Sequence, residues 1–187
     1  MKPRAVHCLA CGGRLRTARI EGRWRRRCPR CGFVFYDNPV PAVVALVRGP
    51  RGLLLARRGR PTYAGTWGLP GGFLEAGELP VQGLRRELRE ELGASATIAG
   101  LLGFYRDRYG PGGFPVLTLV YGARLRGPAA ARSDVAEVRW FAPEAIPWRS
   151  IAFPSIRQAL RDHLKGLKGP GHERRRRGAP ARRASPA

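Results

Sequence analysis

Apolar residues recur along the chain with two different spacings, and the clearest of them predicts an amphipathic helix. Leu84, Leu88 and Leu92 repeat at i, i+4 and i+8, which places all three on one face of a helix. Pro80 suits the first turn of this helix, and Gly93 suits the position just after its last residue. We therefore expect a helix from about residue 80 to 92, with its leucine face in the core.

Other segments predict strands, because they are apolar runs or alternate between apolar and polar residues. These segments are residues 42–47, 53–56, 97–105, 115–126 and 135–141. A short helix is expected between Pro143 and Pro147, and a final amphipathic helix over residues 155–165. The stretch 106–113 is rich in charge and glycine, so we expect a loop there that borders the substrate.

The length of 187 residues suits one globular domain with appendages. Between Phe33 and Pro41 the sequence changes from cysteine-rich to aromatic and proline-rich, so we expect a boundary near Asn38. We divide the chain into residues 1–36, 37–167 and 168–187. The last segment is strongly basic and has no apolar periodicity, so we expect it to be disordered.

Nothing in the sequence predicts a membrane protein. The apolar run 42–47 falls far short of the roughly 20 residues that a membrane span needs. The N-terminus lacks the apolar segment of a secretory signal. We expect a cytoplasmic protein with no membrane contact.

The chain is extremely basic, with a formal net charge of +22 and 32 arginines against 3 lysines. Residues 1–31 carry +9, residues 32–164 carry +6 and residues 165–187 carry +7. Basic ends of this kind attract polyanions, so they suit a weak contact with nucleic acid. The coding bias of a GC-rich genome would also explain the arginines, and composition does not separate the two explanations.

Four cysteines follow the pattern Cys8-x2-Cys11-x16-Cys28-x2-Cys31, which is typical of a four-cysteine zinc site. Glycine follows the second cysteine of each pair, where a metal-binding knuckle has to turn. A segment this short buries too little apolar surface to fold alone, so we expect structural Zn²⁺ to hold it and a chelator to unfold it. Two disulfides are the alternative, and they would need an oxidising compartment. Such a ribbon could bind nucleic acid through its arginines and Trp24, or serve as a structural appendage or as one that forms a homodimer.

Five of the thirteen acidic residues fall between Glu75 and Glu91. On the predicted helix, Glu87, Glu90 and Glu91 lie at i, i+3 and i+4, so three carboxylates share one patch. A divalent cation with oxygen ligands would offset their repulsion, and the preceding Pro70-Gly71-Gly72 turn lets the backbone approach it. The alternative is a solvated helix in which the glutamates pair with neighbouring arginines, for example Arg86 with Glu90.

The same stretch resembles the Nudix box, G-x5-E-x7-R-E-U-x-E-E-x-G-U, where U is aliphatic. The matching residues are Gly72, Glu78, Arg86, Glu87, Leu88, Glu90, Glu91 and Gly93. The resemblance implies an α+β fold, an α/β/α sandwich with a mixed sheet, here preceded by the small zinc ribbon. It also implies hydrolysis of a nucleoside diphosphate linked to another group, with Mg²⁺ or Mn²⁺ as cofactor.

The site residues implied by the resemblance lie in and beside the box. Glu87, Glu90, Glu91 and the backbone of Gly71 would bind the metal ion, Glu90 and Glu91 would be catalytic, and Arg86 would orient the carboxylates, with Glu78 as a further partner. The base that activates water stays open between four carboxylates: Glu90, Glu91, Asp134 and Glu137. Candidates for substrate binding are Arg57, Arg58, Phe73 and Arg106.

A zinc ribbon ahead of a Nudix domain is similar to the NADH pyrophosphatases, but their S-Q-P-W-P-F-P block is absent from residues 95–126. The segments 36–41, 70–73 and 146–154 are more similar to the ribbon-bearing branch associated with ADP-ribose and FAD cleavage. The resemblance therefore favours ADP-ribose or FAD as the nucleotide substrate, with AMP as a product. The alternatives are an NADH or NAD pyrophosphatase, including one acting on NAD-capped RNA, and a non-enzymatic nucleic-acid-binding regulator with a Nudix ligand-sensing fold.

Overall fold

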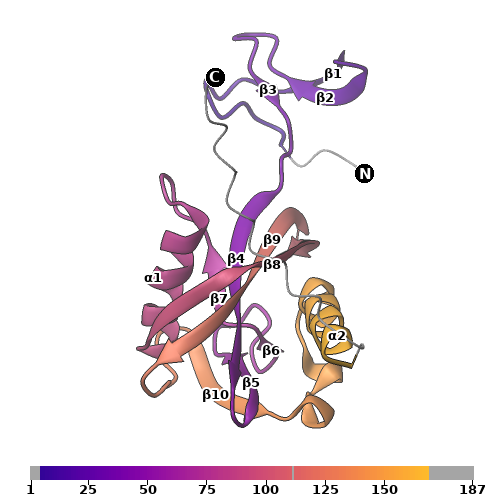
Figure 1. Ribbon diagram of the computed structural model, residues 1–187. Helices are drawn as coiled ribbons and strands as arrows, with labels where there is room; N and C mark the ends of the chain where they lie inside the picture. Colours follow the sequence, from indigo (N-terminus) through magenta and orange to yellow (C-terminus); the bar gives the residue numbers. More distant parts are fainter. Residues whose placement is uncertain (1–4, 111, 169–187) are drawn as a thin grey trace, which may run out of the picture.

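The computed structural model describes residues 5–110 and 112–168, which form a large mixed sheet flanked by helices and a small three-stranded sheet near the N-terminus (Figure 1). The small sheet has the order β1-β2-β3, and the main sheet has the order β10-β5-β4-β9-β8. Two short strands extend the main sheet, since β6 pairs with β5 and β7 pairs with β4. β4 and β9 run parallel, and the other pairs of the main sheet are antiparallel.

The strands are β1 (Arg16–Ile20), β2 (Arg23–Arg27), β3 (Val34–Phe35), β4 (Val40–Gly49), β5 (Gly52–Arg58), β6 (Trp67–Gly68), β7 (Gly71–Phe73), β8 (Ser95–Tyr109), β9 (Phe114–Arg126) and β10 (Val135–Phe141). The helices are α1 (Pro80–Leu92) and α2 (Pro154–Lys168), with short 3-10 turns η1 (Pro143–Ala145) and η2 (Trp148–Ser150). Every strand and helix expected from the sequence is present, with ends shifted by a few residues.

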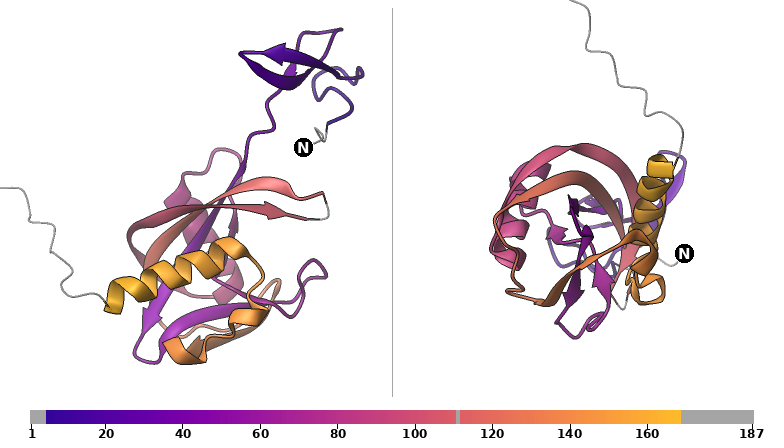
Figure 2. Two further views of the ribbon diagram at one scale, coloured as in Figure 1. Left: turned by 90° about the vertical axis from the view of Figure 1, so that its right-hand side faces the viewer. Right: turned by 60° about the horizontal axis from the view of Figure 1, so that its bottom comes forward.

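Helices cover both faces of the main sheet, which explains the unbroken apolar run in β4. Val43, Ala45 and Val47 pack with the leucines of α1, whereas Val44 and Leu46 pack in the cluster that includes α2. A strand covered on both faces has no solvent side, so it cannot alternate with polar residues. Figures 1 and 2 show the two helices on opposite sides, with β8 and β9 arching over the centre. The expected α/β/α sandwich with a mixed sheet is confirmed.

The helix α1 has the expected limits. Pro80 is its first residue, and Gly93 caps its end with φ at 62°, a left-handed conformation that favours glycine. Gly83, which is unfavourable inside a helix, has a packing role: a Cβ there would lie 2.4 Å from Cδ2 of Leu74. The loop before the helix therefore packs directly on its backbone.

The expected loop at 106–113 is wrong over its first half. Arg106 to Tyr109 continue β8, paired with Leu117 to Phe114 of β9. Arg106 and Arg108 are exposed and alternate with Tyr105, Asp107 and Tyr109, which are partly buried on the inner face. This period of two is that of a strand, although the high density of charged residues is more typical of a loop. The glycines at 110–113 do mark the turn, where the amide of Gly113 donates to the carbonyl of Gly110.

The ribbon stands apart from the main sheet, beyond the N-terminal end of β4 (Figures 1 and 2). β3 ends at Phe35 and β4 begins at Val40, so the boundary expected near Asn38 lies between them. The division into 1–36, 37–167 and 168–187 stays a prediction, and the expected disordered tail from residue 169 lies outside the described residues. Among the residues described, no helix is long and apolar enough to cross a membrane.

Candidate metal and substrate site

A cavity of about 580 Å³ lies where α1, the β6–β7 turn, β8, β9 and the start of α2 meet. Its walls divide by chemistry. One part is acidic and includes Glu87, Glu91 and Asp134, while Arg58 and Arg60 contribute positive charge. Phe73, Tyr109 and Phe153 supply an aromatic wall. The volume falls in the range of about 300–1,000 Å³ that is usual for small-molecule sites.

Glu91 is the buried acid of this cavity. Its side chain points inward from α1, only 7% of the residue is exposed, and Oε2 accepts a hydrogen bond of 2.8 Å from the amide of Gly71. Burial raises the pKa of Glu91 to about 8, the Gly71 amide counteracts it, and the nearby charges of Glu87 and Asp134 raise it further. An ionised carboxylate at this buried position is unfavourable in free energy unless a cation binds beside it.

Gly71 and Gly72 allow two close approaches beside the acids of α1. Gly71 has φ at 132°, and a Cβ there would lie 2.2 Å from the carbonyl oxygen of Val43 in the neighbouring strand. A Cβ on Gly72 would lie 2.5 Å from Oε1 of Glu87. Burial also raises the pKa of Glu87, although hydrogen bonding from Arg86 opposes the shift. Glycine at position 71 therefore lets β7 approach β4, and glycine at position 72 leaves room for the carboxylate of Glu87.

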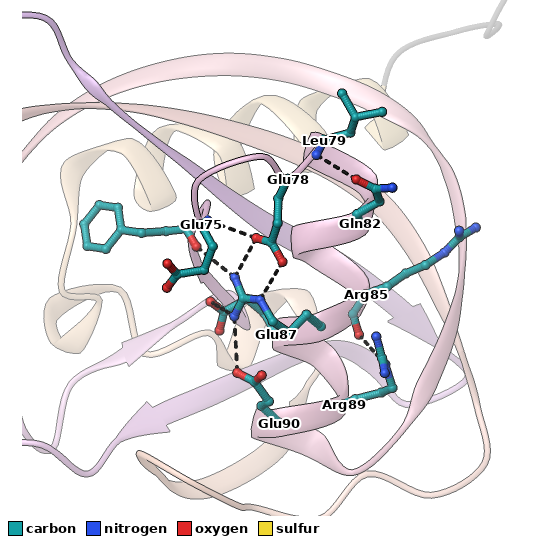
Figure 3. A network of polar contacts seen from close by, with 10 residues as sticks. Glu75, Glu78, Leu79, Gln82, Arg85, Glu87, Arg89 and Glu90 are labelled. Carbon is teal, nitrogen blue, oxygen red and sulfur yellow. Dashed lines mark hydrogen bonds and ion pairs between the residues drawn. The ribbon is translucent and has the colours of Figure 1, made fainter.

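Arg86 connects the remaining acids of the box (Figure 3). Its guanidinium donates to both carboxylate oxygens of Glu78 at 2.7 and 2.9 Å, to Glu87 at 2.9 Å and to Glu90 at 3.2 Å. A further bond of 3.1 Å reaches the carbonyl of Phe73 beside the cavity. The two bonds from Arg86 lower the pKa of Glu78 to about 2. Arg86 therefore pairs both with Glu78, the partner implied by the resemblance, and with Glu90, the partner expected of a solvated helix.

The three box glutamates have different surroundings, although helical spacing places them on one patch. Glu87 and Glu91 line the cavity, whereas the side chain of Glu90 is 52% exposed and bonded to Arg86. The donor set still fits a divalent cation with oxygen ligands, because the buried Glu91 and the partly buried Glu87 both line the cavity and both have a raised pKa. A Cβ at Gly72 would take the space of the Glu87 carboxylate.

The substrate-binding candidates divide into two groups. Arg58 and Phe73 line the cavity, and Arg58 donates a bond of 3.3 Å to the hydroxyl of Tyr109. Arg57 does not line it, because it bonds to the carbonyl of Gly65 at 3.2 Å and pairs with Glu137 at 3.5 Å.

Arg106 is also absent from the cavity wall. It is exposed on β8, on the face opposite to Asp107 and Tyr109. Of the four candidate bases, Glu91 and Asp134 line the cavity, while Glu137 is tied to Arg57 and Arg139 outside it.

Sequence reasoning missed the aromatic wall. Tyr109 lies at its centre, with ring centroids 5.2 Å from Phe73, 5.5 Å from Tyr63 and 5.7 Å from Phe153. Asp107, two residues earlier on the same face of β8, accepts a bond of 3.1 Å from the amide of Ser155 and so ties β8 to the start of α2. The period-two spacing of Tyr105, Asp107 and Tyr109 was the signal that could have revealed this inward face.

The four cysteines of the ribbon gather at one point. Sγ of Cys8 lies 3.5 Å from that of Cys31, Cys11 and Cys28 are also 3.5 Å apart, and all four sulfurs lie within 4.8 Å of one another. These separations exceed the roughly 2.05 Å of a disulfide and are close to the roughly 3.8 Å expected around a tetrahedral zinc ion.

The two knuckles of the ribbon are built alike. The amide of Gly12 donates to the carbonyl of Cys8 and that of Gly32 to Cys28, and both glycines have positive φ. Hydrogen bonding from the backbone of Cys31 is the largest contribution that lowers the pKa of Cys28, to about 7. Against the opposing backbone hydrogen bond of Phe33, the neighbouring thiols and burial raise the pKa of Cys31 to about 12, so the shift of Cys28 does not by itself indicate a metal. The convergence of the four sulfurs is what would let the cluster hold a metal ion.

Comparison with known proteins gives the family. The NUDIX domain model matches residues 38–162. The chain is 45% identical over 151 residues to the NAD-capped RNA hydrolase NudC of Chromobacterium violaceum, a match covering 76% of this chain and 54% of the relative. It is 29% identical over 139 residues to an ADP-ribose pyrophosphatase of Methanocaldococcus jannaschii, covering 73% of this chain and 80% of the relative.

The chain spans about half the length of the NudC relatives that it matches. A solved NUDIX hydrolase from Nitrosomonas europaea superimposes with a TM-score of 0.73 at 31% identity, covering 88% of this chain and 93% of that protein. The box, the sandwich fold and the extent of these matches agree, and the chain belongs to the NUDIX family of hydrolases.

Proposed function

We propose that this protein hydrolyses the pyrophosphate bond of a nucleoside diphosphate linked to another group, with ADP-ribose or FAD as substrate and AMP as one product. The observation that carries the proposal is the cavity itself: Glu87 and Glu91 meet an arginine and an aromatic wall within about 580 Å³. The acids suit metal-assisted phosphate chemistry, Arg58 suits a phosphate, and flat rings suit a nucleobase.

Mg²⁺ or Mn²⁺ is the cofactor of this proposal, held by Glu87, Glu90, Glu91 and the backbone of Gly71. When bound, the cation would neutralise charge on the diphosphate and lower the pKa of a water molecule. Arg86 acts as a positioning residue, because it fixes Glu87 and Glu90 through its guanidinium. Glu91 and Asp134 are the acids placed to accept a proton from water, since both line the cavity.

Two features support ADP-ribose or FAD over NADH. The match to the Methanocaldococcus jannaschii ADP-ribose pyrophosphatase extends over 80% of that relative. In addition, the S-Q-P-W-P-F-P block of the NADH pyrophosphatases is absent from residues 95–126.

A second candidate is cleavage of NADH, NAD or the NAD cap of RNA, and the 45% identity to the Chromobacterium violaceum NudC favours it. All these substrates release AMP or an RNA beginning with 5′-phosphate, and they differ in the second product.

A substrate panel tests the proposal. The protein is incubated with Mg²⁺ and ADP-ribose, FAD, NADH or NAD-capped RNA, and products are separated by chromatography. We expect AMP with ribose 5-phosphate or with FMN, and a loss of at least about 100-fold in Glu91→Gln, which keeps the side-chain shape without the charge. Thermal unfolding of the variant serves as the folding control. Cleavage of none of the four substrates would refute the proposal, and cleavage of NADH or capped RNA alone would select the second candidate.

The remaining parts of the proposal concern the whole chain. Zn²⁺ is the metal that we assign to Cys8, Cys11, Cys28 and Cys31, and residues 1–36, 37–167 and 168–187 are the three segments. A cytoplasmic location, a homodimer and a weak nucleic-acid contact through the basic ends complete it. The non-enzymatic regulator is less favoured, because a ligand sensor has no need of Glu87, Glu90 and Glu91 together.

A further inference from the structure

The ribbon that contains the β1–β2 hairpin carries more positive charge than its own acidic residues can neutralise. Residues 5–36 contain eight arginines and one glutamate, a net charge of +7. Four thiolates around Zn²⁺ would add only −2, so the ribbon would remain strongly positive. Glu21 pairs with Arg25 at 3.7 Å, and Arg25 also lies over the ring of Tyr36 at 4.3 Å. Most of the charge is therefore left without an acidic partner in the described ribbon.

The register of the hairpin places like charges together. Arg16 lies directly opposite Arg27, and both are exposed. Arg23 is exposed on the same face, because Ile20 is its cross-strand partner and the pairs alternate between faces. Like charges opposite each other destabilise a strand pair, so an external anion would relieve a cost that the ribbon otherwise carries.

The opposite face of the hairpin carries Trp24, because successive cross-strand pairs alternate between the two faces. Trp24 is 76% exposed and lies directly opposite Arg19. The ribbon core consists of Cys8, Leu15 and Cys28 with partly buried neighbours, and Trp24 does not belong to it. In the part of the chain that the structure describes, no aromatic ring or cation packs on the indole. Figures 1 and 2 show the hairpin clear of the main sheet, so the main fold does not cover it either.

We propose that the β1–β2 hairpin binds single-stranded nucleic acid, with Trp24 stacking on a base and Arg19 on the same face contacting a phosphate. Arg16, Arg23 and Arg27 on the opposite face add to the attraction for the polyanion. Stacking platforms flanked by cations are the common means of binding single strands without sequence preference. The exposed indole of Trp24 beside the exposed guanidinium of Arg19 fits a chain that offers flat bases and phosphates in alternation. An acidic peptide would satisfy the arginines and leave the indole without a flat partner. The proposal rests on the nucleic-acid contact proposed above for the basic ends and makes it specific; it goes beyond the pyrophosphatase activity and uses no residue of the cavity.

The test is fluorescence anisotropy with the full zinc-loaded chain and a fluorescein-labelled 12-nucleotide RNA carrying a 5′-hydroxyl, which offers no pyrophosphate to cleave. We expect Trp24→Ala to weaken binding about tenfold and Trp24→Tyr to restore most of it, because tyrosine keeps a stacking face. Arg19→Ala should reduce the slope of log affinity against log salt by about 0.7, the value for one phosphate contact on a single strand.

Arg124→Ala is the matched control, since it removes one exposed arginine from β9 of the main fold. It should leave the affinity and the salt slope unchanged, and every variant keeps the same C-terminal tail. A DNA strand of the same sequence distinguishes contacts to the base and phosphate, which both polymers offer, from contacts to the 2′-hydroxyl. Vesicles containing phosphatidylglycerol test whether the surface takes a lipid instead.

Three results would overturn the inference: unchanged binding in Trp24→Ala, an equal loss in Arg124→Ala and Arg19→Ala, or binding to vesicles with none to either polynucleotide. Zinc content and thermal unfolding confirm that each variant is folded. AMP release by Trp24→Ala should equal that of the wild type, and Glu91→Gln should bind RNA as the wild type does. The nucleic-acid surface and the proposed hydrolysis can therefore fail independently.

Discussion

The substitution Gly71→Ala tests how the β6–β7 turn holds the acids of α1. A Cβ at this position would lie 2.2 Å from the carbonyl oxygen of Val43 and 2.8 Å from Cα of Val44, both backbone atoms that cannot rotate away. The residue would also keep φ at 132°, which side chains rarely adopt. Relief of the contact requires β7 to move away from β4, and this takes the Gly71 amide away from Glu91.

The strained backbone costs about 1–3 kcal/mol, and forcing an extra carbon into a packed contact costs about 1–3 kcal/mol more. The sum is at least about 2 kcal/mol, which lowers the Tm of a protein of this size by about 4–8 °C or more. The assay is scanning calorimetry of the zinc-loaded protein. Gly68→Ala is the matched control three residues earlier, because a Cβ there meets nothing within 4 Å; its Tm should stay within about 2 °C. Equal Tm values for the two variants would refute the reasoning.

Three further predictions follow from other contacts of the site and the ribbon. Gly72→Ala places a Cβ 2.5 Å from Oε1 of Glu87; because the obstructed atom is the end of a flexible side chain, we expect little loss of Tm but a rise of about tenfold in the Mg²⁺ concentration for half-maximal AMP release. A strong zinc chelator should unfold the ribbon and leave the main fold intact, seen in calorimetry as loss of the ribbon transition while the transition of the main fold stays in place; a chelator-resistant ribbon would exclude a structural metal. The pKa of Glu78 is lowered to about 2 by Arg86, so its carboxylate contributes stability that is complete above about pH 4.5 and is lost as pH falls toward 2. Glu78→Gln should therefore flatten the decline of Tm between pH 5 and pH 3, and an unchanged decline would contradict the pairing.

The sequence could predict the elements wherever one local pattern decided the structure. The leucines of α1 and the cap at Gly93 depend on neighbours within the same helix, so periodicity located the helix within a residue. Helices cover both faces of β4, so residues 42–47 are continuously apolar. A short apolar run of this kind is itself a signal for a buried strand.

The substrate side was harder to predict, because it depends on which way a strand faces. Arg106 and Tyr109 are three residues apart and lie on opposite faces of β8, and only the register with β9 decides which face is inside. Tyr109 meets Tyr63 and Phe153, which come from distant parts of the chain. No local pattern shows which residues meet across these distances. The charge of Arg106 therefore predicts a substrate contact that the structure does not show, and the sequence gives no sign of the role of Tyr109 in the cavity wall.

For the box glutamates, the sequence predicts a shared patch, and the structure adds the different environment of each side chain. Spacing at i, i+3 and i+4 puts Glu87, Glu90 and Glu91 on one patch, but it gives each the same environment. The fold makes them unequal: Arg86 binds Glu87 and Glu90, whereas Glu91 forms no ion pair within the described residues and relies on the Gly71 amide. The acid with the least positive charge beside it is also the most buried of the three. A cation would lower the energy of Glu91 more than that of Glu90, which is why we expect Glu91→Gln to reduce both metal affinity and AMP release, and Glu90→Gln to affect metal affinity less.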